Sequence, residues 1–167
     1  MSIMNSETGG VRNETSNIIT YGEIQKKQEV LYMENSIRYI SDHPENFKQL
    51  LILYESLGWN SLGLTVNDLK QMCNQSWYAI YAFDKQQLVG MGRVISDGVV
   101  TGIICGVGVL PKYQSKGIGK EMLNRIIQHC EQNRVIPQLM CVENLESYYE
   151  SLGFKKYSIG MTRNIKR

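Results

Sequence analysis

The sequence predicts an α+β fold, with a mixed and mostly antiparallel sheet that carries helices on both faces. Apolar residues recur at helical spacing in some segments and form extended runs in others. Three extended runs between residues 77 and 110 are joined by connections too short for a crossover, so we expect them to pair antiparallel. Further along, extended runs alternate with helical ones, which adds helices to the faces of the same sheet.

The start of the chain differs in composition from the rest. Residues 1–17 are rich in Ser, Asn, Thr, Glu and Gly, and residues 18–33 carry only short apolar clusters. We therefore predict an N-terminal extension over residues 1–33, partly disordered, and one domain over residues 34–167. The first strand of that domain is expected at Ile37–Ser41.

Two helices are predicted after this strand. The first begins near Glu45 and ends at Gly58, and its apolar face is formed by Phe47, Leu50, Leu51 and Tyr54. The second covers about residues 66–74, and either Thr65 or Asn67 is expected to cap it.

Three strands are expected next, at residues 77–83, 88–95 and 99–110. The turns between them are Asp84-Lys-Gln86 and Ser96-Asp-Gly98, which are rich in turn-forming residues.

The strongest helical pattern lies at residues 117–133, where an apolar stripe faces one way and charged residues face the other. His129 lies on the polar side and is expected to be a solvated surface residue. A strand at residues 138–142, a short helix at 145–152 and a final strand at 154–163 complete the prediction.

Composition excludes several classes of protein. The 167 residues are 43% hydrophobic and 20% charged, with three prolines, as in an ordinary globular protein. The net charge of +2 gives no support for a nucleic-acid partner. The sequence lacks both a membrane-length apolar run and the apolar region of a secretory signal, so we expect a cytoplasmic protein without membrane contact. The four cysteines have no metal-ligand spacing, so no metal site is expected.

The segment Cys105–Lys120 carries the clearest chemical pattern. A buried strand leads into a tight turn and then into a long helix, whose N-terminus offers unpaired N–H groups and a positive dipole end. Gly117 and Gly119 have no Cβ, so the backbone can approach a ligand closely. Three lysines add positive charge around the turn: Lys112, Lys116 and Lys120. The pattern predicts a diphosphate site.

Two common phosphate motifs do not fit this segment. A dinucleotide-binding GxGxxG would need a glycine where Pro111 stands, and a P-loop would need Ser or Thr in place of Glu121. The residues Gln114-Ser-Lys-Gly-Ile-Gly119 instead fit Q/R-x-x-G-x-G/A, and so resemble the signature of the GNAT superfamily of acetyl-CoA-dependent N-acetyltransferases.

Other segments strengthen the resemblance to this superfamily. Val109-Leu-Pro-Lys-Tyr113 resembles the family's V-x-P-x-Y, and Tyr148-Tyr-Glu-Ser-Leu-Gly-Phe154 is similar to its F-Y-E-x-x-G-F. Leu53–Trp59 and Val89–Val94 also resemble small bacterial members. The likeness runs from about Ile37 to the C-terminus and implies the GNAT fold.

The resemblance implies which residues bind acetyl-CoA. The strand backbone at Val107, Gly108 and Val109 would hydrogen-bond the pantetheine arm. Contacts to the pyrophosphate carry over, mostly through backbone N–H groups, to Gln114, Ser115, Lys116, Gly117, Ile118 and Gly119, with Lys120 adding charge. Independently of the family, glycines at 106 and 108 inside a strand indicate a bulge or a close approach of another group.

The resemblance also assigns a catalytic acid. Tyr149 aligns with the tyrosine that protonates the leaving thiolate, a task suited to a phenol. No general base is identified, because Gly106 stands where many relatives carry a carboxylate. A water held by backbone carbonyls, Asp97 and Glu55 remain as alternatives.

The acceptor is expected between the first two helices and the neighbouring hairpin. The candidate residues are Tyr54, Trp59, Asn60, Arg93 and Asp97. Trp59 could equally be a core anchor, and Arg93 and Asp97 could pair with each other.

The expected function is direct acetyl transfer from acetyl-CoA to a primary amine of a small molecule in a ternary complex. The alternatives are a protein N-terminus or lysine as acceptor, a non-catalytic acyl-CoA sensor, and a covalent route through Cys105 or Cys141, both expected on strands. The sequence does not decide the oligomeric state; a homodimer through the C-terminal strands, which is common in relatives, is one option.

Overall fold

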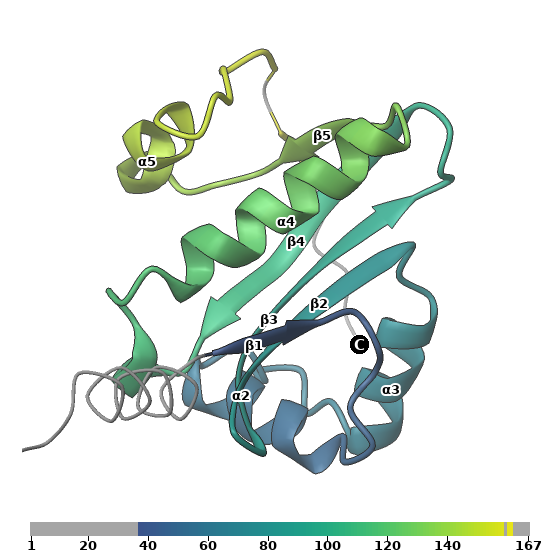
Figure 1. Cartoon of the computed structure of the whole chain (residues 1–167), viewed down its shortest axis with the longest axis vertical. Coiled ribbons are helices and arrows are strands. Elements are labelled where there is room, and N and C mark those ends of the chain that lie inside the picture. The colour runs from purple at the N-terminus through teal and green to yellow at the C-terminus, as the bar shows by residue number, and fades with distance from the viewer. Residues whose placement is uncertain (1–36, 159, 162–167) are drawn as a thin grey trace, which may run out of the picture. The chain divides into compact units, whose positions relative to one another are not determined.

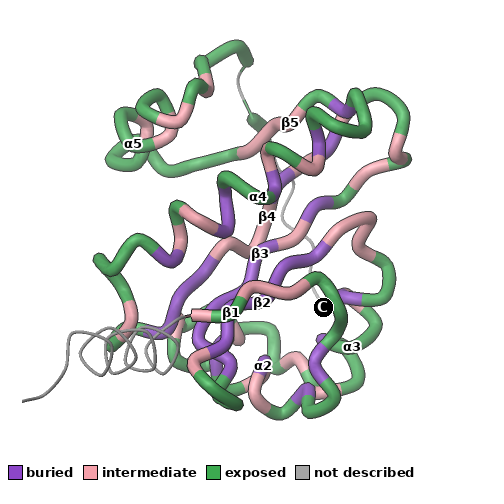
Figure 2. The backbone as a smooth tube through the Cα atoms, in the orientation of Figure 1, coloured by how far each residue is buried: buried purple, intermediate pink, exposed green. Residues whose placement is uncertain are grey.

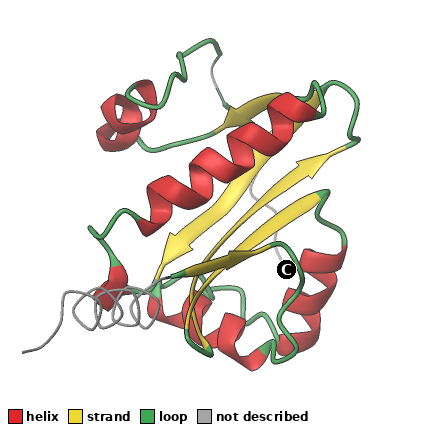
Figure 3. Cartoon of the chain, in the orientation of Figure 1, coloured by secondary structure: helices red, strands yellow, loops and turns green. Residues whose placement is uncertain are grey.

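The structure is a computed structural model that describes residues 37–158, 160 and 161. The chain divides into two units, Met1–Asn35 and Ser36–Arg167, and every described residue belongs to the second. The predicted N-terminal extension at residues 1–33 lies outside the described residues. In the second unit a five-stranded sheet has the order β1-β2-β3-β4-β5 and carries helices on both faces (Figure 3).

Four strands pair antiparallel, and the fifth pairs parallel to the fourth. They are β1 (Arg38–Ile40), β2 (Tyr78–Asp84), β3 (Gln87–Ser96), β4 (Thr101–Val109) and β5 (Ile136–Leu139). The predicted α+β class and the three consecutive antiparallel strands are therefore confirmed. The parallel pair requires a crossover, which a helix between β4 and β5 provides.

Helices α2 (Lys48–Ser56) and α3 (Val66–Asn74) lie on one side of β3, and α4 (Ile118–Gln132) lies on the other (Figure 1). The alternation of side chains along β3 shows this, since a Cβ on Gly92 would meet Ile126 of α4 whereas Arg93 faces α3. The capping alternatives for α3 resolve to Thr65, which forms a reciprocal capping box with Asp68.

The core is formed where β2 and β3 cross the centre of the sheet (Figure 2). Every residue of β2 from Ala79 to Phe83 is buried, and so are the apolar stripes of the flanking helices. Leu50 and Leu53 of α2 and Met122 and Ile126 of α4 are completely or almost completely enclosed. This packing gives β3 and β4 a rigid position between the two helical layers.

The C-terminal part differs from the prediction. Helix α5 (Glu146–Glu150) is shorter than predicted, and β5 begins two residues earlier and ends at Leu139. The predicted final strand at 154–163 is wrong for the described residues 154–158, 160 and 161, which form no strand. The described residues of this segment pair with no strand, although β5 and the second half of β4 each have a free edge.

Candidate active site

Strand β4 has one edge that is only half paired. It pairs with β5 from Thr101 to Ile104, and beyond Leu139 the chain leads away toward α5 (Figure 1). On that edge, the segment from Cys105 to Val109 has no strand partner among the described residues. Its backbone groups can therefore hydrogen-bond an extended ligand, as the edge of a sheet does.

The two glycines within this segment have different roles. Gly106 has φ +61° and lies at a shift in register, where it and Val107 face the single residue Gly92. Gly108 instead allows close packing, because a Cβ there would lie 2.5 Å from Leu57 Cδ1 and 2.6 Å from Trp59 Cη2. The bulge and the close approach predicted from these glycines are thus both present.

The loop after β4 is held by its own side chains. The Tyr113 hydroxyl donates a hydrogen bond of 2.6 Å to Asp84 Oδ2, and Gln114 Nε2 donates one of 2.9 Å to the Val109 carbonyl. The ammonium groups of Lys112 and Lys116 lie 5.0 and 5.2 Å from the centre of the Tyr113 ring. These contacts fix the turn between the strand and α4 before any ligand binds.

The fixed turn presents a group of unpaired backbone donors. Gly117, the N-cap of α4, has φ +82° and no side-chain cap, and Ser115 has φ +59°. The first hydrogen bond of the helix joins the Glu121 N–H to the Gly117 carbonyl at 3.0 Å. The N–H groups of residues 115–120 have no acceptor within the described part of the chain. Together with the helix dipole they form a site for an anion.

Tyr149 lies on α5, half-buried between two other aromatic rings. Its ring is edge-to-face with those of Tyr148 at 5.2 Å and Phe154 at 6.0 Å. Its hydroxyl has no hydrogen-bond partner among the residues described. Burial raises its pKa, and Tyr148 and Cys141 raise it further, so the phenol keeps its proton at neutral pH.

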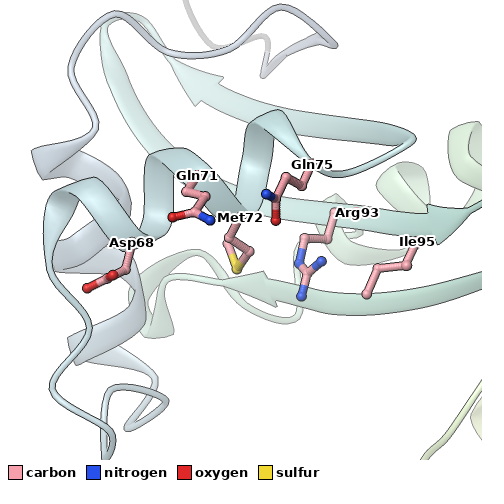
Figure 4. Close-up of a pocket in the computed structure, with 6 residues that line it drawn as sticks. All are labelled: Asp68, Gln71, Met72, Gln75, Arg93 and Ile95. Atoms are coloured by element: carbon pink, nitrogen blue, oxygen red, sulfur yellow. The ribbon is translucent and has the colours of Figure 1, made fainter.

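Three of the predicted acceptor residues come together beside the bulge. The Tyr54 hydroxyl donates to Met72 Sδ at 3.3 Å, and the Tyr54 ring is edge-to-face with Trp59 at 5.6 Å. A Cβ on Gly106 would lie 3.4 Å from the Tyr54 hydroxyl and 3.7 Å from Arg93 Nε. Arg93 also reaches into an open pocket of about 410 Å³ between α3 and β3 (Figure 4), lined by Asp68, Gln71, Met72, Gln75, Arg93 and Ile95.

The comparison with protein families decides the identity of the fold. The sequence model of one protein family, described as the acetyltransferase (GNAT) family, matches residues 44–154 of this chain. The chain belongs to the GNAT acetyltransferase family. The match includes the half-paired edge of β4, the loop after it and the turn into α4.

Individual relatives agree with this assignment. GCN5-related N-acetyltransferase 3, chloroplastic, from Arabidopsis thaliana is 35% identical over 46% of this chain, a stretch that covers only 32% of that protein. An uncharacterized N-acetyltransferase of Pyropia yezoensis is 29% identical over 71% of this chain and 70% of its own length. A solved Trypanosoma brucei acetyltransferase has the same fold, with a TM-score of 0.66 and 18% identity over 78% of this chain and all of that one.

Two predicted acceptor residues lie away from the pocket of this GNAT domain. The Asn60 side chain closes its own loop, donating to the Leu64 carbonyl at 3.2 Å and accepting from its N–H at 2.6 Å. Asp97 caps the β3–β4 turn by accepting from the N–H groups of Val99 and Val100, which lower its pKa. The suggested pair between Arg93 and Asp97 is absent from the described contacts.

The pocket also contains residues that the sequence analysis missed. Asp68, Gln71, Met72 and Gln75 repeat at helical spacing, so they share the face of α3 that points at β3. That spacing was visible in the sequence, but without the neighbouring strand it indicated only a helix face. Trp59 packs on Gly108 and remains 39% exposed, so it contacts β4 without being buried in the core.

One histidine and two cysteines lie in environments that differ from those predicted for them. His129 is not a solvated surface residue, because its ring stacks on Tyr78 at 3.9 Å and burial lowers its pKa. Burial raises the pKa of the Cys105 thiol, which makes it a poor nucleophile. Cys141 is exposed and lies beyond the end of β5, not on a strand as expected.

Two further features of the described residues concern membranes and metals. No helix there is long and apolar enough to cross a membrane. No group of three or more His, Cys, Asp or Glu side chains there is arranged to hold a metal ion.

Proposed function

We propose that this GNAT acetyltransferase transfers an acetyl group from acetyl-CoA to a primary amine of a small molecule, directly within a ternary complex. One observation supports the proposal above others. The unpaired N–H groups of residues 115–120 follow directly after the unpaired half of β4, so an anion site and an extended-ligand site adjoin. A diphosphate joined to a linear arm requires that combination.

The residues present fit acetyl-CoA. The backbone of Val107, Gly108 and Val109 would hold the pantetheine arm at the open edge of β4. The N–H groups from Ser115 to Lys120 would hold the pyrophosphate, with the lysine side chains adding charge. Gln114 would contribute only through its backbone, because its side chain is bound to the Val109 carbonyl.

Tyr149 is the proposed general acid. When bound, acetyl-CoA supplies the acetyl group as a thioester, which an amine nitrogen attacks. Tyr149 is protonated at neutral pH and would give this proton to the departing sulfur, which would leave as the free CoA thiol. The chain's main contribution beyond that is to hold the amine beside the open edge of β4, which replaces an encounter in solution by a fixed geometry.

No side chain is assigned as the general base. Asp97 is engaged by the turn N–H groups, and Glu55 is exposed on α2. We propose that the amine loses its proton to water beside the bulge at Gly106, the position without a side chain.

The test is release of free CoA thiol with a panel of polyamines, amino sugars, arylalkylamines, aminoglycosides and short peptides with free N-termini. Intersecting initial-rate lines for acetyl-CoA and the best amine are expected. Parallel lines would contradict direct transfer. Tight acetyl-CoA binding without release for any amine would favour a sensor, and release with peptides alone would favour a protein acceptor.

Two further parts of the proposal concern the setting of the enzyme. We propose that the enzyme acts in the cytoplasm and that it assembles as a homodimer. Light scattering of the purified full chain tests the dimer, since a mass of one chain at micromolar concentration would contradict it.

A further inference from the structure

Arg93 brings a positive charge into the pocket between α3 and β3, where its described contacts include the Tyr54 hydroxyl but no ion pair. Its Nε is buried and has no hydrogen-bond partner. Among the described residues, no carboxylate forms an ion pair with it. A guanidinium remains charged throughout the physiological pH range, and leaving one of its buried donors unpaired is costly.

Four titratable groups close to Arg93, one on each of four elements, are neutral at neutral pH. The Arg93 charge acts on Tyr54 of α2, Cys73 of α3, Tyr81 of β2 and Cys105 of β4. Burial raises the pKa of each of these four groups, so none supplies a negative charge at neutral pH.

One carboxylate does line the pocket, but it has another task. Asp68 accepts hydrogen bonds from the Thr65 N–H at 2.7 Å and from the Thr65 hydroxyl at 2.6 Å, as part of the cap of α3. Figure 4 shows it near one end of the row of lining residues, with Arg93 and Ile95 toward the other end. These two hydrogen bonds make Asp68 part of the cap of α3, and no ion pair between Asp68 and Arg93 is among the described contacts.

Next to the guanidinium, the chain has a glycine and therefore no side chain. At Gly106 a Cβ would lie 3.7 Å from Arg93 Nε, which is ordinary contact distance, yet no side chain is present. A carboxylate at that position would have been within reach of Arg93. Gly106 therefore supplies no counter-ion to Arg93, and a bound anion would have to reach the guanidinium through the pocket that the Arg93 side chain lines.

We infer that the pocket between α3 and β3 binds an anionic oxygen group of the acceptor, a carboxylate or a phosphate, with Arg93 as its counter-ion. The inference rests on the proposed function for the amine end of the acceptor. Gln71 and Gln75 offer amide donors on the facing side of α3, and Met72 and Ile95 offer apolar contact for the carbon chain. The acceptor is therefore an acidic amine, such as an amino acid or an amino-alcohol phosphate.

Stability separates this role from a structural one. A structural arginine stabilises the fold, whereas a ligand-binding arginine without a partner costs stability in the free protein. Arg93→Met keeps the apolar stem and removes the charge, so we expect an unchanged or higher Tm for this variant. Arg38→Met is the matched control, because Arg38 is exposed on β1 and lies over the Phe83 ring.

The experiment uses matched pairs of ligands on the full-length protein. One arm compares amino acids with their amides, and the other compares amino-alcohol phosphates with the free amino alcohols. Binding of the N-acetylated forms is measured by calorimetry in the presence of CoA, which does not require acetyl transfer. Turnover of the free amines is measured by thiol release.

In one of the two arms, either the carboxylate or the phosphate arm, the acidic ligand should bind on the order of tenfold more tightly than its neutral partner, as expected for hydrogen bonds to a charged group. Arg93→Met should remove this preference, Arg93→Lys should keep part of it, and Arg38→Met should keep all of it. In turnover, Arg93→Met should raise the KM for the acid and leave that for acetyl-CoA unchanged. The arm that shows the preference identifies the anion as carboxylate or phosphate.

Two results would overturn the inference: no pair with an Arg93-dependent preference, or a lower Tm of Arg93→Met with the preference retained. Arg93-dependent binding without turnover of any amine would instead support the anion site and contradict the proposed function.

Discussion

The proposed cofactor side and the proposed acceptor side of this domain are built in different ways. On the cofactor side, one continuous segment from Cys105 to Lys120 presents backbone groups, and its side chains mainly hold the loop in place. On the acceptor side, Tyr54 and Trp59 come from one segment and Arg93 from a distant one, and all three present their side chains. The first side depends on backbone conformation, the second on individual functional groups.

This difference predicts how each side responds to mutation. A site made of N–H groups tolerates the loss of a side chain but not a change of φ, because the direction of each donor follows the backbone. A site made of side chains tolerates small backbone changes but depends on each charge or ring. The same difference explains why families share the first kind of site and vary the second.

The largest effect is expected for Gly117→Val. Valine disfavours φ +82°, so the turn must change and the N–H groups of residues 115–120 lose their common direction. We expect acetyl-CoA affinity to fall by about a hundredfold or more, as for the loss of at least two hydrogen bonds to a charged group. Calorimetry with CoA and acetyl-CoA measures this.

Gly63→Val is the matched control for that variant. Gly63 has φ +67°, and, as at Gly117, a Cβ there would meet nothing within 4 Å. Both variants should lose roughly 1–2 kcal/mol of folding free energy through the left-handed backbone. Only Gly117→Val should lose acetyl-CoA binding. Normal acetyl-CoA affinity in this variant would contradict an anion site made of backbone N–H groups.

The next effect is expected for Tyr149→Phe. This change keeps the aromatic contacts to Tyr148 and Phe154 and removes the hydroxyl, which has no described partner to lose. We expect kcat to fall by about a hundredfold, in the range for loss of a general acid, with acetyl-CoA affinity unchanged. Tyr148→Phe should keep normal kcat, and equal turnover in the two variants would contradict the acid role.

Gly108→Ala tests the point where the two sides meet. The added methyl would lie 2.5 Å from Leu57 Cδ1 and 2.6 Å from the Trp59 ring, so both must move. We expect a loss of about 1–3 kcal/mol in the free energy of unfolding, measured with urea. In combination with Trp59→Leu, which removes the ring, the loss should be smaller than the sum of the two single effects.

Gly119→Ala serves as the stability control for that prediction. A Cβ on Gly119 would lie 3.7 Å from Val109 Cγ2, an ordinary contact, and the position is already helical. Its stability should not fall, since alanine favours the helix. If the stability losses of Gly108→Ala and Trp59→Leu simply add in the double variant, the added methyl group does not clash with the Trp59 ring.

The cofactor side could be predicted from the sequence for a physical reason. A backbone site in one segment needs glycines at fixed spacing, and Gly106, Gly108 and Gly117 each have a geometric cause in the structure. The hairpins and the long helix were also predictable, because their apolar periods are set by neighbours in sequence.

The acceptor side could be predicted only in part. Arg93 and Tyr54 were recognised as candidates, but their closeness to α3 depends on packing between distant segments. Asn60 and Asp97 were polar residues in the expected region, and each turned out to bond its own loop or turn. The final strand failed for a similar reason, since a strand pattern does not reveal whether the segment pairs with any of the free edges of the sheet.

The smallest effect is expected for Lys116→Ala. Lys116 is exposed and contacts the Tyr113 ring, so its charge acts on a ligand only through water-screened attraction. Acetyl-CoA affinity should fall about two- to threefold at low salt, and the difference should vanish near 1 M salt, where the Debye length is about 3 Å. Lys70→Ala on α3 is the control for a general loss of positive charge. A salt-independent loss as large as that of Gly117→Val would mean that side chains, not backbone groups, hold the diphosphate.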